Sequence, residues 1–137
     1  MAYWLVKTEP GEWSWDDQVK AGTTHWHGVR NYQASNNLKA MALGDRAFFY
    51  HSVNEKRIVG IVEVVKLYYP DHTDETGRFG MVDVKAVAPL KTPVTLDQIK
   101  TDPALNHLLV ARHSRLSVSP VDDAAWAHIC KLGGVAV

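Results

Sequence analysis

Residues 25–37 combine side chains that could hold a planar, polar ligand. Trp26 offers a flat apolar face, while Arg30, Asn31 and Gln33 offer fixed hydrogen-bond donors and acceptors. A nucleobase needs both, because it is held by a surface on which it stacks and by partners along its polar edge. A structural interpretation is also open, in which Trp26 fills the core and Asn31 caps the following helix.

Other side chains suited to ligand contact lie on neighbouring segments. Lys7 offers a point charge for a phosphate or a base carbonyl, although an exposed edge-strand lysine is the structural alternative. Tyr50 could form a second aromatic wall or be a core tyrosine. His51 and Ser52 end the same segment and can donate to an oxygen. Arg30 could stack on a base, pair with a phosphate or pair with a carboxylate.

Strands must position most of these residues. Aromatic and β-branched residues predict strands over residues 3–8, 46–53, 57–69 and 81–90. The second and third are separated by a short turn, so we expect an antiparallel hairpin. Gly60 indicates a bulge or a close backbone approach.

Short helices complete the pattern. The helix that begins at Asn31 is expected to end at residues 43–45, where glycine is the natural stop. Another helix is expected to begin at residues 102–103. Residues 22–28 read as a loop. With four or five antiparallel strands, these elements predict an α+β domain built on a small barrel or a strongly curved sheet. The predicted N-caps are Ser14, Asn31, Thr95 and Asp122.

Composition limits the partners. The 137 residues suit one domain over residues 1–137, and 15 Lys plus Arg balance 15 Asp plus Glu. Without a basic excess, nucleic-acid contact should be confined to a pocket.

Cys130 is the single cysteine and is expected to be buried and inert. No signal peptide or long apolar run is recognised, so we expect a cytoplasmic or nucleoplasmic protein that binds no membrane. We also expect a monomer that needs no cofactor.

Five separated blocks of the chain share one family pattern. The blocks are YWLVKTEP at 3–10, WHGVRNYQASNN at 26–37, GDRAFFYHS at 44–52, IVGIVEVV at 58–65 and SRLSVSPV at 114–121. Together they resemble the EVE domain family, which includes thymocyte nuclear protein. The resemblance implies a PUA-like fold, a mixed, curved β-barrel with helices packed around it, related to the YTH and SRA readers of modified bases. It also implies a domain without catalysis that binds DNA or RNA carrying a modified base, with modified cytosine the leading candidate.

Two positions depart from the family pattern, because His27 replaces a common acidic residue and Ser35 a frequent basic one. We expect both to alter charge at the pocket rim. Leu116 could contact a cytosine methyl group, worth about 0.8 kcal/mol or fourfold in affinity. The residues expected to bind the ligand are Lys7, Trp26, Val29, Arg30, Asn31, Gln33, Tyr50, His51, Ser52, Arg115, Leu116 and Ser117.

Three alternatives to base binding differ in the support that the sequence gives them. A hydrolase lacks a recognisable nucleophile motif, and the adjacent His51 and Ser52 would point to opposite faces of a strand. A metal site has only the His25-x-His27 pair in its favour. A small-molecule sensor or a protein-interaction module could use the same pocket, and the neutral net charge leaves this alternative open.

Overall fold

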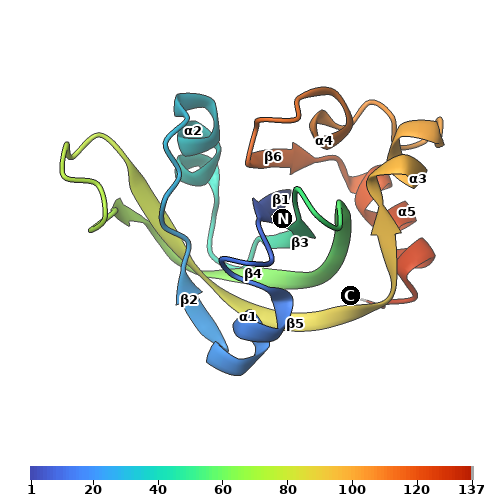
Figure 1. The fold of residues 1–137 in the computed structure, drawn as a ribbon, viewed down its shortest axis with the longest axis horizontal. Coiled ribbons are helices and arrows are strands. Elements are labelled where there is room, and N and C mark those ends of the chain that lie inside the picture. Colours follow the sequence, from blue (N-terminus) through green and yellow to red (C-terminus); the bar gives the residue numbers. More distant parts are fainter. Residues whose placement is uncertain (137) are drawn as a thin grey trace.

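The computed structural model describes residues 1–136 and contains one six-stranded sheet in the order β2-β5-β4-β3-β1-β6. Only β1 and β3 run parallel, and every other neighbouring pair is antiparallel. The outer strands β2 and β6 are not paired with each other, so the curved sheet stays open rather than closing into a barrel (Figure 1). The strands are β1 (Tyr3–Thr8), β2 (Thr23–His25), β3 (Arg46–His51), β4 (Arg57–Pro70), β5 (Gly80–Thr95) and β6 (Val118–Val121).

Five helices are attached to this sheet within the described residues. All four predicted N-caps are confirmed, since the side chain of each accepts from a backbone N–H in the first helical turn. Ser14 and Thr95 form complete capping boxes. The helices are α1 (Trp15–Ala21), α2 (Tyr32–Ala40), α3 (Leu96–Thr101), α4 (Leu109–Arg112) and α5 (Asp123–Gly133).

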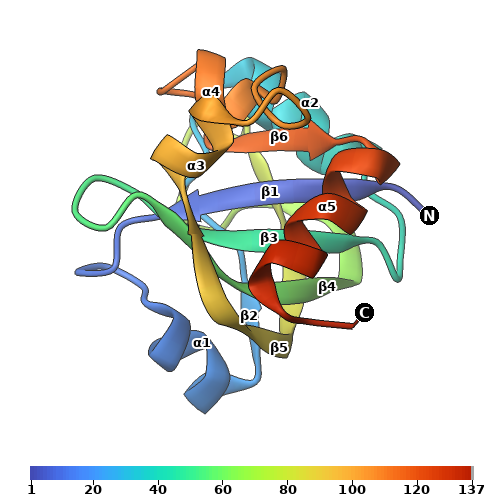
Figure 2. The same cartoon turned by 90° about the vertical axis from the view of Figure 1, so that its right-hand side faces the viewer.

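The core lies on both faces of the sheet, because successive side chains of a strand point to opposite sides. On β3, Phe49 packs in one cluster with Trp15 and Trp26. Its neighbour Phe48 packs in the other cluster and stacks on Trp126 of α5, with ring centroids 3.9 Å apart. Figure 2 shows α5 crossing this second face.

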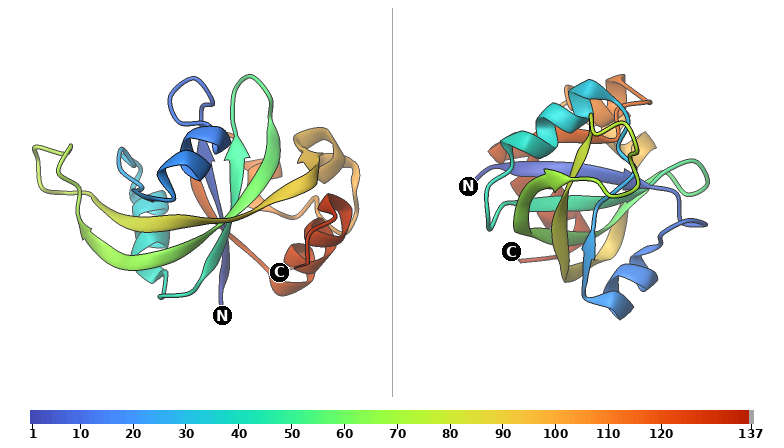
Figure 3. Two further views of the ribbon diagram at one scale, coloured as in Figure 1. Left: turned by 90° about the horizontal axis from the view of Figure 1, so that it is seen from below. Right: turned by 90° about the vertical axis from the view of Figure 1, so that its left-hand side faces the viewer.

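The long β4–β5 ribbon connects the two ends of the molecule (Figure 3). The expectation for Gly60 is confirmed, because the β4–β5 register shifts between residues 58 and 60. A Cβ atom on Gly60 would lie 2.6 Å from ring atoms of Trp15. Glycine therefore lets α1 pack directly on the backbone of β4.

Several sequence-based expectations differ from the structure. The sheet is mixed and has six strands instead of four or five antiparallel ones. The strand β1 runs parallel to β3, and residues 23–25 and 118–121 add two short strands, the first of them within the expected loop. The helix α2 ends at Ala40, before the expected stop at 43–45. Residues 103–107 form a turn instead of a helix, with the Asp102 carboxylate accepting from the N–H of Ala104 at 2.9 Å. No helix within residues 1–136 is long and apolar enough to cross a membrane.

Candidate functional site

A cavity of about 900 Å³ opens where the end of β1, the segment after β2, the β3–β4 turn and the loop before β6 meet. Its volume lies within the range of about 300–1,000 Å³ that is typical of small-ligand sites. Half of the expected ligand-binding residues line it. They are Lys7, Trp26, Val29, Ser52, Arg115 and Ser117.

Trp26 belongs to the core and to the cavity wall at once. It is only 7% exposed, and its ring meets Phe49 edge-on with centroids 5.5 Å apart. Its backbone N–H donates to the carbonyl of Val82 at 2.7 Å, which fixes the start of the segment. The structural interpretation of Trp26 is therefore confirmed, and one part of its surface still faces the cavity.

Glu9, Glu12 and Trp13 are among the cavity residues that were not expected to bind the ligand. They belong to the turn after β1, where the N–H groups of Glu12 and Trp13 donate to the carbonyl of Glu9. The half-buried Trp13 ring is oriented by its Nε1–H, which donates to Oε1 of Gln18 at 2.9 Å. A tryptophan directly after a turn signal was the available clue, but turns lack the periodicity that reveals which way a side chain points.

Lys7 reaches the cavity from the end of β1. Its ammonium donates to the carbonyl of Ser114 at 3.2 Å, on the loop that forms the opposite wall. Burial lowers the pKa of Lys7 from its ordinary value. The cation is therefore partly desolvated, which strengthens any contact it makes with an oxygen of a ligand.

A second, smaller cavity of about 360 Å³ adjoins the first and shares Ser114 and Arg115 with it. Three more expected residues, Asn31, Gln33 and Leu116, line only this smaller cavity. The expected site is thus divided between two neighbouring spaces. The smaller cavity is lined by Asn31, Gln33, Arg112, His113, Ser114, Arg115 and Leu116.

Asn31 confirms its expected structural role. Its Oδ1 accepts from the N–H of Ala34 at 2.9 Å, at the first turn of α2. The side-chain amide group of Asn31 remains a donor at the same position. The cap and a ligand contact are therefore compatible in this one side chain.

The two remaining β3 residues of the expected site line neither cavity. Tyr50 is 3% exposed on the Phe48 face of β3, and burial raises the pKa of its hydroxyl to about 12. The buried His51 ring bridges two groups, since Nε2 accepts from the N–H of Trp15 at 3.0 Å and Nδ1 lies 2.8 Å from Glu55. Because the backbone N–H of Trp15 can only donate, Nε2 must accept and carries no proton. The ring proton of this tautomer is therefore on Nδ1, which donates it to Glu55.

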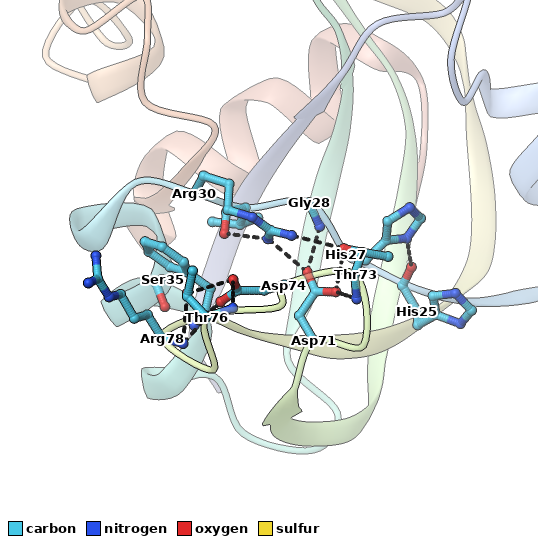
Figure 4. A network of polar contacts seen from close by, with 12 residues as sticks. His25, His27, Gly28, Arg30, Ser35, Asp71, Thr73, Asp74, Thr76 and Arg78 are labelled. Atoms are coloured by element: carbon cyan, nitrogen blue, oxygen red, sulfur yellow. Dashed lines mark hydrogen bonds and ion pairs between the residues drawn. The ribbon is translucent and has the colours of Figure 1, made fainter.

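Arg30 holds a structural ion pair, one of the three roles considered for it. Its guanidinium lies 3.0 Å from the Asp71 carboxylate, whose side chain is fully buried. Asp71 also accepts from the N–H of Gly28 at 2.8 Å and from the backbone and hydroxyl of Thr73 (Figure 4). The β4–β5 loop thereby holds the cavity-lining segment in place.

Burial opposes ionisation of Asp71, but the hydrogen bonds from Thr73, Gly28 and Arg30 outweigh it. Together they hold the pKa of this carboxyl well below its usual range. Asp71 is therefore a charged anchor beneath residues 28–30.

The two departures from the family pattern lie in different environments. His27 lines the larger cavity, and its Nδ1 lies 3.3 Å from the carbonyl of His25. Ser35 is buried and hydrogen-bonds to the hydroxyl of Tyr68, so it is not at the rim as expected.

Among residues 1–136 no group of three His, Cys, Asp or Glu side chains is arranged to hold a metal ion.

Comparison with known proteins places these features in a family. The family model of the EVE domain matches residues 2–132. Thymocyte nuclear protein 1 of Gallus gallus is 39% identical over 166 aligned positions, which cover 95% of this chain and 68% of the relative.

Solved structures agree with this assignment. A protein from Rhodopseudomonas palustris superimposes with a TM-score of 0.92 at 52% identity, covering 98% of this chain and 94% of that one. Human THYN1, solved in complex with DNA containing 5-methylcytosine, gives a TM-score of 0.89 at 33% identity over 100% of both chains.

The expected relationship to YTH domains is confirmed at the level of the fold. The YTH domain of a Zygosaccharomyces rouxii protein superimposes with a TM-score of 0.62 at 16% identity and covers 99% of this chain. The curved mixed sheet is therefore of the PUA-like type. The chain belongs to the EVE domain family.

Proposed function

We propose that this protein is a non-catalytic domain that binds nucleic acid carrying a modified cytosine and holds that base in the larger cavity. The observation that carries the proposal is the composition of this cavity, which joins two tryptophans to carboxylates and cations. The human relative in complex with 5-methylcytosine DNA supports the choice of ligand.

The energetics of base flipping fit this arrangement. Extruding a base from a duplex costs a few kcal/mol, and stacking on an aromatic side chain returns about 1–3 kcal/mol per base. Trp13 and Trp26 both line the cavity, and Trp13 is the more exposed of the two. Trp13 therefore supplies the larger accessible stacking surface, and the core-anchored Trp26 supplies a rigid one.

Polar groups around the cavity suit the edge of cytosine. Cytosine carries an exocyclic amino group that donates to carboxylates, and Glu9 and Glu12 provide carboxylates at the cavity. Its carbonyl oxygen accepts, and Lys7, Arg115 and Ser117 provide donors. Thymine presents an acceptor where cytosine presents the amino group, so the carboxylates favour cytosine.

The methyl group itself adds little energy. A buried methyl contributes about 0.8 kcal/mol, which corresponds to about fourfold in affinity. Val29, which is buried and lines the larger cavity, is the apolar partner we assign to it. Leu116, the partner expected from the sequence, lines the smaller cavity instead.

Binding of fluorescently labelled DNA duplexes that contain one cytosine, 5-methylcytosine or thymine at the same position tests this proposal. The wild-type protein should prefer 5-methylcytosine to cytosine by about fourfold and reject thymine more strongly. Replacing Trp13 with leucine should weaken binding to the modified duplex by about tenfold. Tyr32→Leu removes an exposed aromatic residue that lines neither cavity and should bind like the wild type.

Equal affinity for all three duplexes would contradict the proposal. So would a Trp13→Leu protein that is folded, by circular dichroism, and binds the modified duplex as tightly as the wild type. Salt-independent binding of a free metabolite, without binding of any oligonucleotide, would instead make the cavity a small-molecule site.

A further inference from the structure

The smaller cavity differs from the larger one in its charge. Glu9 and Glu12 line the larger cavity, whereas no Asp or Glu is among the residues that line the smaller one. Two arginines, Arg112 and Arg115, lie at the smaller cavity together with neutral hydrogen-bond donors. A space lined by cations and donors is suited to an anion.

The cations of this cavity are available for a ligand. Arg30, Arg46 and Arg57 form ion pairs with carboxylates, but Arg112 and Arg115 form none within residues 1–136. Arg112 donates through Nε to the carbonyl of Asn106 at 3.1 Å, and its terminal nitrogens make no hydrogen bond in the described part of the chain. Each guanidinium can therefore present two parallel donors to one phosphate group.

The first turn of α2 adds to this environment. Asn31 and Gln33 line the cavity at the start of the nine-residue helix. The partial positive charge at a helix N-terminus favours a nearby anion. Gln33 is exposed and forms no side-chain hydrogen bond within residues 1–136, so its amide can donate to the same ligand.

The position of the cavity identifies which anion would bind. Ser114 and Arg115 line both spaces, so a nucleotide whose base enters the larger cavity brings its backbone alongside the smaller one. We propose that the smaller cavity binds a DNA backbone phosphate next to the flipped base. This inference rests on the proposed function and would explain how a chain with 15 basic and 15 acidic residues binds DNA.

A thermodynamic cycle between one arginine and one phosphate tests the assignment. The protein change is Arg112→Gln, since Arg112 lines only the smaller cavity. The DNA change is a neutral methylphosphonate, placed in turn at each phosphate around a single 5-methylcytosine. Affinity is measured across a series of salt concentrations. Lys131→Gln on α5 is the matched control, because it removes one exposed cation that lines neither cavity.

We expect Arg112→Gln to weaken binding of methylated and unmethylated duplexes equally, by about tenfold, and to reduce the salt slope by about 0.9. At one position, the methylphosphonate should weaken binding by the wild type more than binding by Arg112→Gln, because Arg115 still contacts the phosphate in the variant. Gln33→Leu should weaken binding a few-fold without changing the salt slope, because it removes a neutral donor. Lys131→Gln should match the wild type.

Additive effects at every position would overturn the phosphate site. If methylation is still discriminated in that case, the base-binding proposal survives alone. Absence of binding to any duplex would overturn both. A cycle that couples only on an RNA oligonucleotide would overturn the assignment to DNA.

Discussion

Neutralising Asp71 should loosen the segment that lines the larger cavity. In an Asp71→Asn variant the side chain keeps its size but loses its charge and one of its two acceptor oxygens. The wild-type carboxylate accepts from Gly28, Arg30 and twice from Thr73, and its side chain is fully buried. Hydrogen bonds to a charged group contribute about 1.5–3 kcal/mol each, and breaking a buried ion pair costs about 3–5 kcal/mol.

Arg30 is 39% exposed and can be solvated when Asp71 is neutral, so the lower end of this range applies. We expect a loss of about 3 kcal/mol in the free energy of unfolding. For 137 residues this lowers Tm by about 10 °C, since about 2.1 cal/mol/K per residue is released on unfolding. Thermal denaturation followed by circular dichroism measures it.

The pH dependence provides a second readout. The pKa of Asp71 is lowered in the folded protein, so its carboxylate contributes fully to the free energy of unfolding at any pH above its unfolded pKa of about 4. This stabilisation is lost as the pH falls through the pKa of Asp71 in the folded state. The Tm difference between wild type and Asp71→Asn should therefore be constant from pH 5 to 7 and shrink below about pH 4.

Asp74→Asn is the matched control, because Asp74 accepts a similar set of bonds within the same loop but none from residues 28–30. It should be less destabilising and leave DNA affinity nearly unchanged. Asp71→Asn should weaken DNA binding as well. A Tm equal to the wild type, or a Tm difference that does not shrink in acid, would refute the anchoring role of Asp71.

Three further predictions concern the scaffold. Gly60→Ala should cost about 1–3 kcal/mol in unfolding free energy, measured by urea denaturation, because its Cβ would lie 2.6 Å from the Trp15 ring; wild-type stability would contradict this close packing. Asp122→Ala should cost about 1 kcal/mol through loss of the α5 cap. The hydrogen bond from His107 lowers the pKa of Asp122, so this loss should diminish as the pH falls below about 4, and a pH-independent loss would count against it. Tyr50→Phe should leave DNA affinity within about twofold, since Tyr50 lines neither cavity; a tenfold loss would place Tyr50 in the site after all.

Local chemistry was readable from the sequence. The four N-caps, the β3–β4 hairpin and the close approach at Gly60 each depend on a few neighbouring residues, and all are found in the structure. The parallel pairing of β1 with β3 was not readable, because it joins residues about forty positions apart and leaves no local pattern.

The candidate site also contains residues that could be expected from the sequence and residues that could not. Trp26, Lys7 and Arg115 were expected in one site, and they line one cavity although they are far apart in the chain. Asp71 and Trp13 were not anticipated, because a polar loop and a turn have no periodicity that would indicate burial or direction. Tyr50 was placed in the expected site as an aromatic residue, but strand alternation turns it to the opposite face from Phe49.

The most direct test follows the methyl group itself. A duplex whose single 5-methylcytosine carries a ¹³C-labelled methyl would be saturated with protein and observed by NMR. If the base enters the cavity beside Trp13 and Trp26, ring currents should shift the methyl proton signal upfield, and Trp13→Leu should reduce that shift. A methyl signal that keeps its free-duplex position in the saturated complex would show that the base remains stacked in the DNA, and the central claim would be wrong.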